Sequence, residues 1–155
     1  MTRIAIILLA AAFFTGCFNE PDYPVEPQIG FLEVSSTSDP ILALTSDVYV
    51  RFSFQDGDGD LGRISDDDTT QNMFVVDLRN GFVNSLSYSI PPIPKKGSSP
   101  ATKGDISFNF RNSLFCDPLE PGKQIDTVQY EIYVKDRAGN ISNTITTSPI
   151  VIKCF

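Results

Sequence analysis

Histidine and tryptophan are both absent from this chain of 155 residues. Without histidine, the chain lacks the commonest general base and the commonest zinc ligand in proteins. Basic residues are also few, because 12 Lys and Arg stand against 19 Asp and Glu and leave a formal net charge of −7. Binding to nucleic acid depends on clustered positive charge. The composition therefore argues against histidine-based catalysis and against a nucleic-acid partner.

Long hydrophobic runs are scarce as well, and the longest one, from Ile4 to Phe14, opens the chain. A run of this length is too short to span a bilayer as a helix. It follows Arg3 and precedes the small residues Thr15 and Gly16. A cationic start, an apolar centre and small residues before a cleavage point describe a secretory signal, which we predict over residues 1–16.

The motif Phe14-Thr15-Gly16-Cys17 resembles the lipobox of bacterial lipoproteins. The resemblance implies that Cys17 carries acyl chains such as palmitate and becomes the first residue of the mature protein. Phe18 rather than aspartate follows the cysteine, and acids come soon after at Glu20 and Asp22. This arrangement is similar to that of outer-membrane lipoproteins, some of which face outward. It implies an outer-membrane location by lipid anchor, with exposure at the cell surface as one option.

Prolines at every third position follow Cys17, at residues 21, 24 and 27. Such spacing favours an extended, stiff segment. We predict a tether over residues 17–28, and an arm packed on the following domain is the alternative.

Two cysteines, Cys116 and Cys154, remain once Cys17 is assigned to lipid. In a secreted chain such a pair predicts one disulfide, with two free buried thiols as the alternative. The bond would close a loop of about 38 residues and contribute roughly 4 kcal/mol. It would join the last strand to the loop that follows Phe115.

Residues 29–155 show the period-two alternation of half-buried strands, and no stretch after residue 20 has a convincing helical period. The residues predicted to point inward are Val48, Val50, Phe52 and Phe54; Phe74, Val76 and Leu78; Leu86, Tyr88 and Ile90; Ile106, Phe108 and Phe110; and Val128, Tyr130, Ile132 and Val134. A first strand is predicted from Ile29 to Val34 and a last one from Asn143 to Ile152. About seven short strands predict an all-β, immunoglobulin-like antiparallel sandwich of two sheets.

The acidic stretch Asp56-Gly57-Asp58-Gly59-Asp60 follows one of these strands. Carboxylates at alternate positions, with glycines that let the backbone turn tightly, suit the oxygen coordination of calcium. The spacing is not that of an EF-hand, because Leu61 stands where that loop requires glycine. A hydrated turn without an ion is the alternative.

A second polar stretch, Val134 to Ser142, also leaves a strand and contains Asp136 and Asn140. In an immunoglobulin-like sandwich the two stretches would be the B–C and F–G loops, which lie at the same end of the fold. We therefore predict one shared calcium site, with ligands from Asp56, Asp58, Asp60, Asp136 and Asn140.

These two loops, DGDGDLG and KDRAGN, are similar to those of bacterial immunoglobulin-like and cadherin-like surface domains. The resemblance implies a calcium-stabilised, non-catalytic module for adhesion, assembly or binding, with a surface protein or a glycan as partner. One alternative is a glycan-binding accessory lipoprotein, which predicts outward aromatics such as Tyr49 and Tyr133. A less favoured alternative is a small glycan hydrolase that uses the clustered carboxylates.

Overall fold

The structure, a computed structural model, describes residues 22–79, 85–95, 97, 99–111, 114–117 and 122–154. The predicted signal sequence and Cys17 lie outside these residues. Within them the chain forms strands and no helix, so none of the described residues makes a helix that could cross a membrane. The strands are β1 (Gln28–Ser36), β2 (Val48–Asp56), β3 (Met73–Asp77), β4 (Ser85–Tyr88), β5 (Thr102–Asn109), β6 (Ile125–Val128), β7 (Tyr130–Val134), β8 (Ile145–Thr146) and β9 (Ile150–Lys153).

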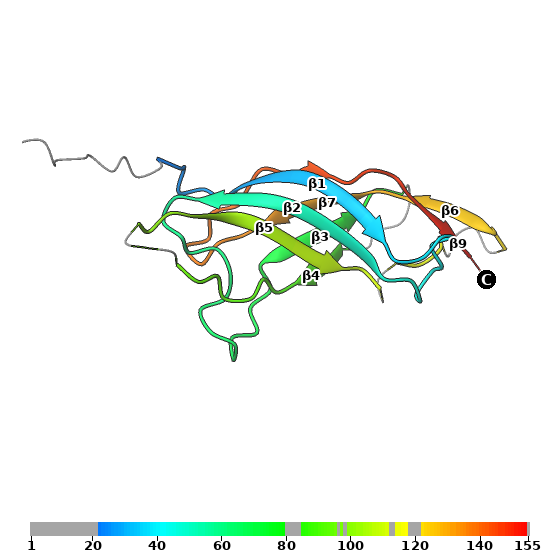
Figure 1. Ribbon diagram of the computed structural model, residues 1–155, viewed down its shortest axis with the longest axis horizontal. Coiled ribbons are helices and arrows are strands. Elements are labelled where there is room, and N and C mark those ends of the chain that lie inside the picture. Colours follow the sequence, from blue (N-terminus) through cyan, green and yellow to red (C-terminus); the bar gives the residue numbers. More distant parts are fainter. Residues whose placement is uncertain are drawn as a thin grey trace, which may run out of the picture.

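The strands form three antiparallel sheets with the orders β1-β2-β5, β4-β3-β7-β8 and β6-β9. Figure 1 shows the first sheet lying along β3, β4 and β7, with β6 and β9 at the end where the chain finishes. Phe52 of β2, Val75 of β3 and Ile132 of β7 belong to one buried core. The all-β prediction is therefore confirmed, and the arrangement is consistent with a β-sandwich.

The alternation in β2 and β7 is the clearest link between sequence and fold. In β2 the residues Val48, Val50, Phe52 and Phe54 are all buried, as predicted. In β7 the predicted inward residues Tyr130, Ile132 and Val134 are buried too. Both strands are central in their sheets, so their inner faces supply the middle of the core.

The predicted inner face of β3 is wrong. Phe74, Val76 and Leu78 were predicted to point inward, but the buried residues are Met73, Val75 and Asp77. Both sets contain apolar side chains, so alternation alone leaves the choice open. Pairing with β7 decides it, because Val75 lies opposite the buried Ile132. Residues directly opposite each other share a face of the sheet, and Phe74 therefore lies on the outer face with Tyr133.

Nine strands are present in the described residues, rather than about seven, because two predicted strands are each divided. The strand predicted around Val128 to Lys135 becomes β6 and β7, separated at Gln129. The strand predicted from Asn143 to Ile152 becomes β8 and β9, and Pro149, which has no N–H for a sheet, precedes β9. The halves pair separately, β7 with β8 and β6 with β9.

The chain enters the domain at the end that carries the acidic loop (Figure 1). There the N–H of Gly57 donates to the carbonyl oxygen of Pro24 at 2.8 Å. The side chain of Asn143 holds the start of β1, since it accepts a bond from the N–H of Ile29 and donates one to its carbonyl oxygen, both at 2.8 Å. The described part of the predicted tether, residues 22–27, thus makes contact with the domain beside the candidate site.

Candidate metal centre

Asp56 reaches the site because it is the last residue of β2. It continues the inward set of that strand, so its side chain is carried beneath the loop and is fully buried. One carboxylate oxygen, Oδ2, accepts a hydrogen bond from the N–H of Leu61 at 2.7 Å. Leu61 is itself buried in the core at 1% exposure. Leu61, which stands where an EF-hand loop has glycine, therefore anchors the acidic loop to the core.

The glycines of the acidic loop stand where neighbouring backbone leaves no room for a side chain. A Cβ on Gly57 would overlap the carbonyl oxygens of Tyr23 and Pro24, and a Cβ on Gly59 would overlap that of Pro100. Gly59 also has a φ of 65°, a conformation that glycine adopts without strain. The loop is thus confined between the N-terminal segment and the segment that leads into β5.

Asp56, Asp58 and Asp60 each contribute one ligand atom to a group in which all three atoms lie within 4.8 Å of one another. The Oδ1 oxygen of each is buried and accepts no hydrogen bond from any residue that the structure describes. Buried carboxylate oxygens without partners are costly, because they have lost water and gained nothing in exchange. A proton or a cation among these oxygens would offset that cost.

The raised pKa values within the cluster also favour a bound proton or cation. Burial, followed by the neighbouring Asp58 and Asp60, raises the pKa of Asp56 from 3.8 to about 6, against a lowering by its bond from Leu61. The pKa of Asp60 is also raised, first by burial and then by the charges of Asp136 and Asp58. The neighbouring carboxylates thus make the ionised forms of Asp56 and Asp60 less favourable, and a bound cation would offset this repulsion.

The structure brings the second predicted loop against the first. The N–H of Ala138 donates to Oδ2 of Asp60 at 2.9 Å, and the N–H of Arg137 donates to the carbonyl oxygen of Asp60 at 3.4 Å. Arg137 also donates from its guanidinium to the carbonyl oxygen of Gly62 at 3.1 Å. The acidic loop and the loop after β7 are therefore held together at one end of the domain.

Asp136 and Asn140 lie in this second loop, where they organise a turn. Oδ1 of Asp136 accepts bonds from the N–H groups of Gly139 and Asn140, and Oδ2 accepts one from the Asn140 side chain. Asp136 is buried and close enough to raise the pKa of Asp60, but it does not belong to the group of three clustered carboxylates. The assignment of Asp136 and Asn140 as metal ligands therefore stays a prediction.

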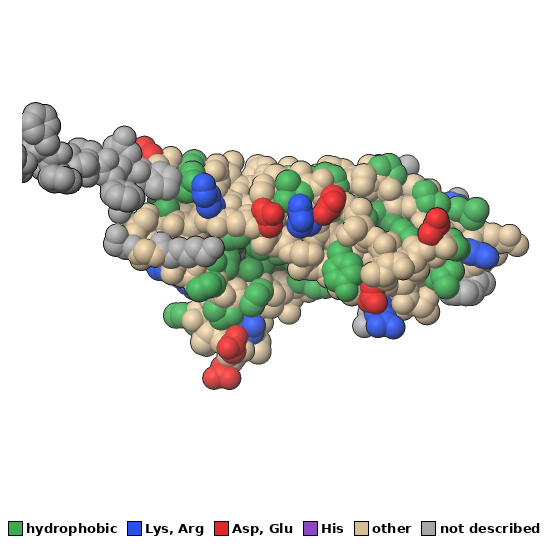
Figure 2. All heavy atoms as spheres, in the orientation of Figure 1, with side chains coloured by type: hydrophobic (Ala, Val, Ile, Leu, Met, Phe, Trp, Pro, Cys, Tyr) green, Lys and Arg blue, Asp and Glu red, His purple; other side chains and the backbone are tan. Residues whose placement is uncertain are grey.

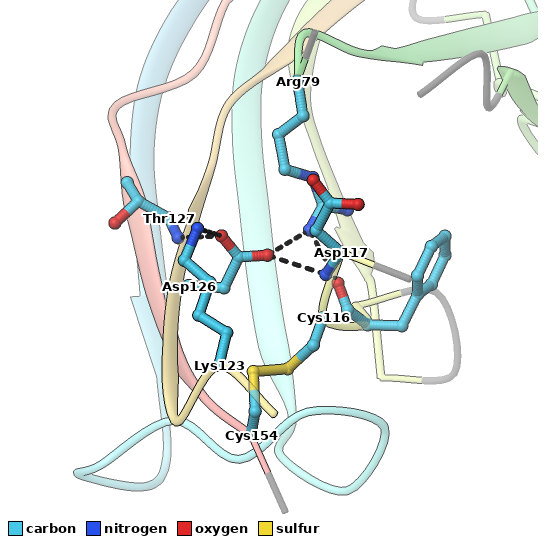
Figure 3. Close-up of a disulfide and its surroundings, with 8 residues drawn as sticks. Arg79, Cys116, Asp117, Lys123, Asp126, Thr127 and Cys154 are labelled. Carbon is cyan, nitrogen blue, oxygen red and sulfur yellow. Dashed lines mark hydrogen bonds and ion pairs between the residues drawn. A yellow bond between two sulfur atoms is a disulfide. The ribbon is translucent and has the colours of Figure 1, made fainter. Parts of the chain in front are cut away.

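A second charged cluster, which the sequence reasoning missed, lies near the disulfide between Cys116 and Cys154, whose Cα atoms are 6.0 Å apart. Arg79 is 9% exposed, and its guanidinium bonds the buried carboxylates of Asp77 at 2.5 Å and Asp126 at 2.6 Å. Figure 3 shows Asp126 between Lys123 and Thr127 on one side and Arg79 and Asp117 on the other. The only signal in the sequence is an arginine two residues after an aspartate at a strand end.

This second cluster has its charges paired, unlike the acidic loop. Asp126 accepts bonds from the N–H groups of Asp117 and Thr127 and from Lys123 and Arg79, and these outweigh its burial and lower its pKa to about 2. The arrangement ties the end of β3 to β6 and to the Cys116 segment. We assign it a structural role at the end of the domain remote from the acidic loop.

Comparison with known proteins gives no relative from which a function could be transferred. No family model, no curated protein and no solved structure matches this chain.

Proposed function

We propose that Asp56, Asp58 and Asp60 bind one calcium ion, and that this ion stabilises one end of a non-catalytic binding domain. The observation that carries the proposal is the set of three buried Oδ1 oxygens without partners. Oxygens that share a calcium ion at 2.3–2.6 Å lie within about 5 Å of one another, and the ligand atoms here lie within 4.8 Å. Calcium also accepts flexible coordination by several protein oxygens, whereas magnesium keeps several of its waters and demands near-ideal octahedral geometry.

Burial favours this proposal over the two alternatives. Water would satisfy the carboxylates of a hydrated turn, whereas the three Oδ1 atoms are buried. A glycan hydrolase needs a carboxyl group that reaches the substrate and a partner roughly 5 Å or more away. Three carboxylates gathered around one point suit a shared ion better than an acid and a base acting from opposite sides.

The second loop would act on the site mainly by position. Ala138 and Arg137 fix Asp60 through backbone hydrogen bonds, and the turn around Asp136 holds both donors in place. Asp136 and Asn140 remain candidate ligands in this proposal, since each carboxylate oxygen has two lone pairs. Calcium would then connect the loop after β2 to the loop after β7.

Calcium titration tests this proposal directly. The full chain, purified in mild detergent, should bind one ion by calorimetry and melt at higher temperature in excess calcium than in calcium-free buffer. An ion present at a hundred times its dissociation constant adds about 2.7 kcal/mol. Asp58→Asn should abolish the increment, while Asp66→Asn, whose side chain is 94% exposed, should retain it. Equal melting temperatures with and without millimolar calcium would refute the site.

We further propose that the domain has immunoglobulin-like topology. With β1, β2 and β5 taken as strands A, B and E, and β3, β7 and β8 as C, F and G, the sheet orders correspond to those of that fold. β4 would be the added strand beside C. This assignment supports the B–C and F–G labels of the two loops and their place at one end.

The biological setting that we propose is a lipoprotein anchored in the outer membrane through Cys17, with the domain binding a surface protein or a glycan in adhesion or assembly. The support is the lipobox-like motif and the proline-rich segment that joins the domain at one end. Palmitate labelling of the chain and of Cys17→Ser tests the anchor. Label that persists in the variant would refute lipidation at this residue, and protease treatment of whole cells would show which side displays the domain.

A further inference from the structure

Strand β5 forms an open edge of the sheet β1-β2-β5. The N–H of Phe110 donates to the carbonyl oxygen of Val48 at 2.8 Å, and the same register continues without a shift along β5. Residues of an antiparallel pair alternate, so the even-numbered residues of β5 exchange backbone bonds with β2 and the odd-numbered ones direct their N–H and C=O groups away from it. Lys103, Asp105 and Ser107 are such residues, and these backbone groups bond no residue that the structure describes.

The other edge of the same sheet is protected. β1 has a bulge between Phe31 and Glu33, and the side chain of Asn143 occupies both backbone groups of Ile29. Bulges and covered backbone groups are common means of preventing an edge strand from pairing with another chain. β5 has eight residues and no bulge, and Figure 1 shows it at the border of its sheet, where no described strand pairs with its outer side. A further strand can therefore be added at β5.

A groove of about 720 Å³ lies beside this edge. Residues 101–107 form one wall, and residues 90–94, which follow β4, form part of the other. Three of these five residues are prolines, which have no N–H to offer to a sheet. An added strand would therefore pair with β5 alone, and on its inner face it would cover the partly exposed side chains of Ile93 and Ile106.

The outer face of β5 carries opposite charges two residues apart. Lys103 and Asp105 are both exposed there, and Figure 2 shows charges of both signs along the outer face of this sheet. Asp105 has Arg51 of β2 at 4.0 Å, whereas Arg51 lies closer to Glu33, at 3.4 Å. Arg51 is on the β2 side of Asp105, so a strand added on the other side would leave this contact in place.

We propose that β5 pairs with β5 of a second copy of this chain, antiparallel about a two-fold axis at Gly104. In this register Lys103 of each copy lies opposite Asp105 of the other, so two opposite-charge pairs form and the free backbone groups of both residues are satisfied. A shift by two residues in either direction would place Lys103 opposite Lys103 or Asp105 opposite Asp105, which is unfavourable. A shift by one would meet even-numbered residues, whose backbone groups β2 already uses.

The place at which the chain enters the domain is compatible with this dimer. Gln28, the first residue of β1, lies opposite Gln55, and Gln55 lies opposite Lys103. Both entry points would thus lie close to the axis, about 24 Å apart, which is five strand spacings of about 4.8 Å. Under the proposed anchoring, two chains could pair while both stay attached to one membrane, which would raise their effective concentration. The pairing itself depends neither on the anchor nor on calcium.

An unrelated extended peptide fits this edge less closely than a second copy. It could satisfy the backbone groups of β5 equally well, because those carry no sequence preference. To match Lys103 and Asp105, however, it would need an acid and a base at the same spacing and in the right order. A second copy supplies both by symmetry, since the patch that binds is also the patch that is bound.

Disulfide trapping in the full chain tests the register. Lys103→Cys and Asp105→Cys are prepared separately, mixed in mild detergent, oxidised and separated on a non-reducing gel. Residues directly opposite each other have Cα atoms about 5.5 Å apart, within disulfide range. Two copies of the same variant would place their cysteines about 8 Å apart, beyond that range. We expect a cross-linked dimer in the mixture and at least about tenfold less in either variant alone.

Two controls accompany the trapping. The unmodified chain, in which Cys116 and Cys154 are already bonded to each other, should give no cross-link under the same oxidation. Lys103→Cys mixed with Lys153→Cys, an exposed position on β9, measures chance collision within detergent micelles and should give no more product than the single variants.

Charge exchange tests the ion pairs by sedimentation equilibrium of the full chain in density-matched detergent. Lys103→Glu places an acid opposite Asp105 at two symmetric positions and should weaken dimerisation by about tenfold, and Asp105→Lys should do the same with two bases. The two changes together recreate both pairs in reverse and should return the affinity to near that of the unmodified chain. Lys153→Glu is the matched control and should leave it unchanged.

These variants alter exposed side chains, so their melting temperatures should stay near that of the unmodified chain and confirm that each is folded. Equal cross-linking in the mixture and in the collision control would overturn the proposal, as would a combined variant that dimerises no better than the single ones. A chain that stays monomeric at millimolar concentration would also overturn it, and binding of a foreign strand peptide by that monomer would assign the edge to another protein.

Discussion

The effect of pH on calcium stabilisation gives the sharpest test of the acidic loop. Asp56 has a folded pKa raised from 3.8 to about 6. A raised carboxyl pKa means that the folded protein takes up a proton more readily than the unfolded chain. Without calcium, the cost of the buried charge is therefore present in full above about pH 6 and is relieved as the pH falls towards 4.

The size of the effect follows from linkage. Between about pH 7.5 and pH 5, protonation of Asp56 should stabilise the calcium-free domain by about 1 kcal/mol, and Asp60 acts in the same direction. Calcium requires the ionised carboxylates, so protonation competes with it and weakens apparent affinity about tenfold at pH 5. At a fixed calcium concentration near a hundred times the dissociation constant, the calcium increment should fall from about 2.7 kcal/mol to about half that value.

The assay is thermal unfolding with and without calcium at both pH values. The calcium-induced rise in melting temperature at pH 5 should be about half of that at pH 7.5. Asp126 does not interfere, because its lowered pKa of about 2 affects stability only as the pH falls below about 4. An increment that is equal at both pH values, or larger at pH 5, would refute the reasoning.

Asp56→Asn gives an independent check on the free-energy cost of burying the charge of Asp56. The amide keeps an acceptor for the N–H of Leu61 but carries no charge into the buried site. In calcium-free buffer at pH 7.5 the variant should therefore melt higher than the unmodified chain, and it should show no increment in calcium. A variant that melts lower in calcium-free buffer would mean that the ionised carboxylate of Asp56 does not destabilise the domain.

Three further predictions concern the rest of the domain. Arg79→Met should lower the free energy of unfolding in urea by about 3–5 kcal/mol, because it leaves buried carboxylates without their cation. The control Arg111→Met, which loses only an exposed ion pair, should lower it by less than about 1 kcal/mol. Similar losses in the two variants would contradict the structural role assigned to Arg79. Replacing both Cys116 and Cys154 by serine should cost about 4 kcal/mol, from a sequence separation of 38, and a loss below about 1 kcal/mol would show that the bond does not limit unfolding. Gly57→Ala should displace the N-terminal segment, seen as faster hydrogen exchange at residue 57, and unchanged exchange would argue against that contact.

The sequence was most informative where one strand face carried all the apolar residues. In β2 the outward positions hold Tyr49, Arg51, Ser53 and Gln55, so only one orientation buries hydrophobic surface. The contact between the two polar loops was also predictable, because β2 and β7 were identified and the loops that follow them lie at one end of a sandwich. The partnerless oxygens of the acidic loop depend on exact packing, which a sequence does not specify.

Prediction failed where a strand is apolar on both faces. β3 offers Met73 and Val75 on one face and Phe74 and Val76 on the other. Only its pairing with β7, which is not written in β3 itself, selects the buried face. The same limitation hid one partner of Arg79, since Asp126 lies far along the chain and comes near it where Asp77 of β3 pairs with Tyr130 of β7. Long-range register therefore determined both features.

The way in which β1 joins the domain has a mechanical consequence. Under the proposed anchoring, tension from the membrane would enter at Gln28, directed along β1 and away from the far end of the domain. β1 would then have to slide past β2, with which it has eight paired positions. In this shearing geometry the backbone hydrogen bonds share the load and break together, whereas peeling would break them in turn. Asn143 adds its two bonds to Ile29 at the point where the load enters. A domain attached in this way would resist pulling along its strands more strongly than its thermal stability alone suggests.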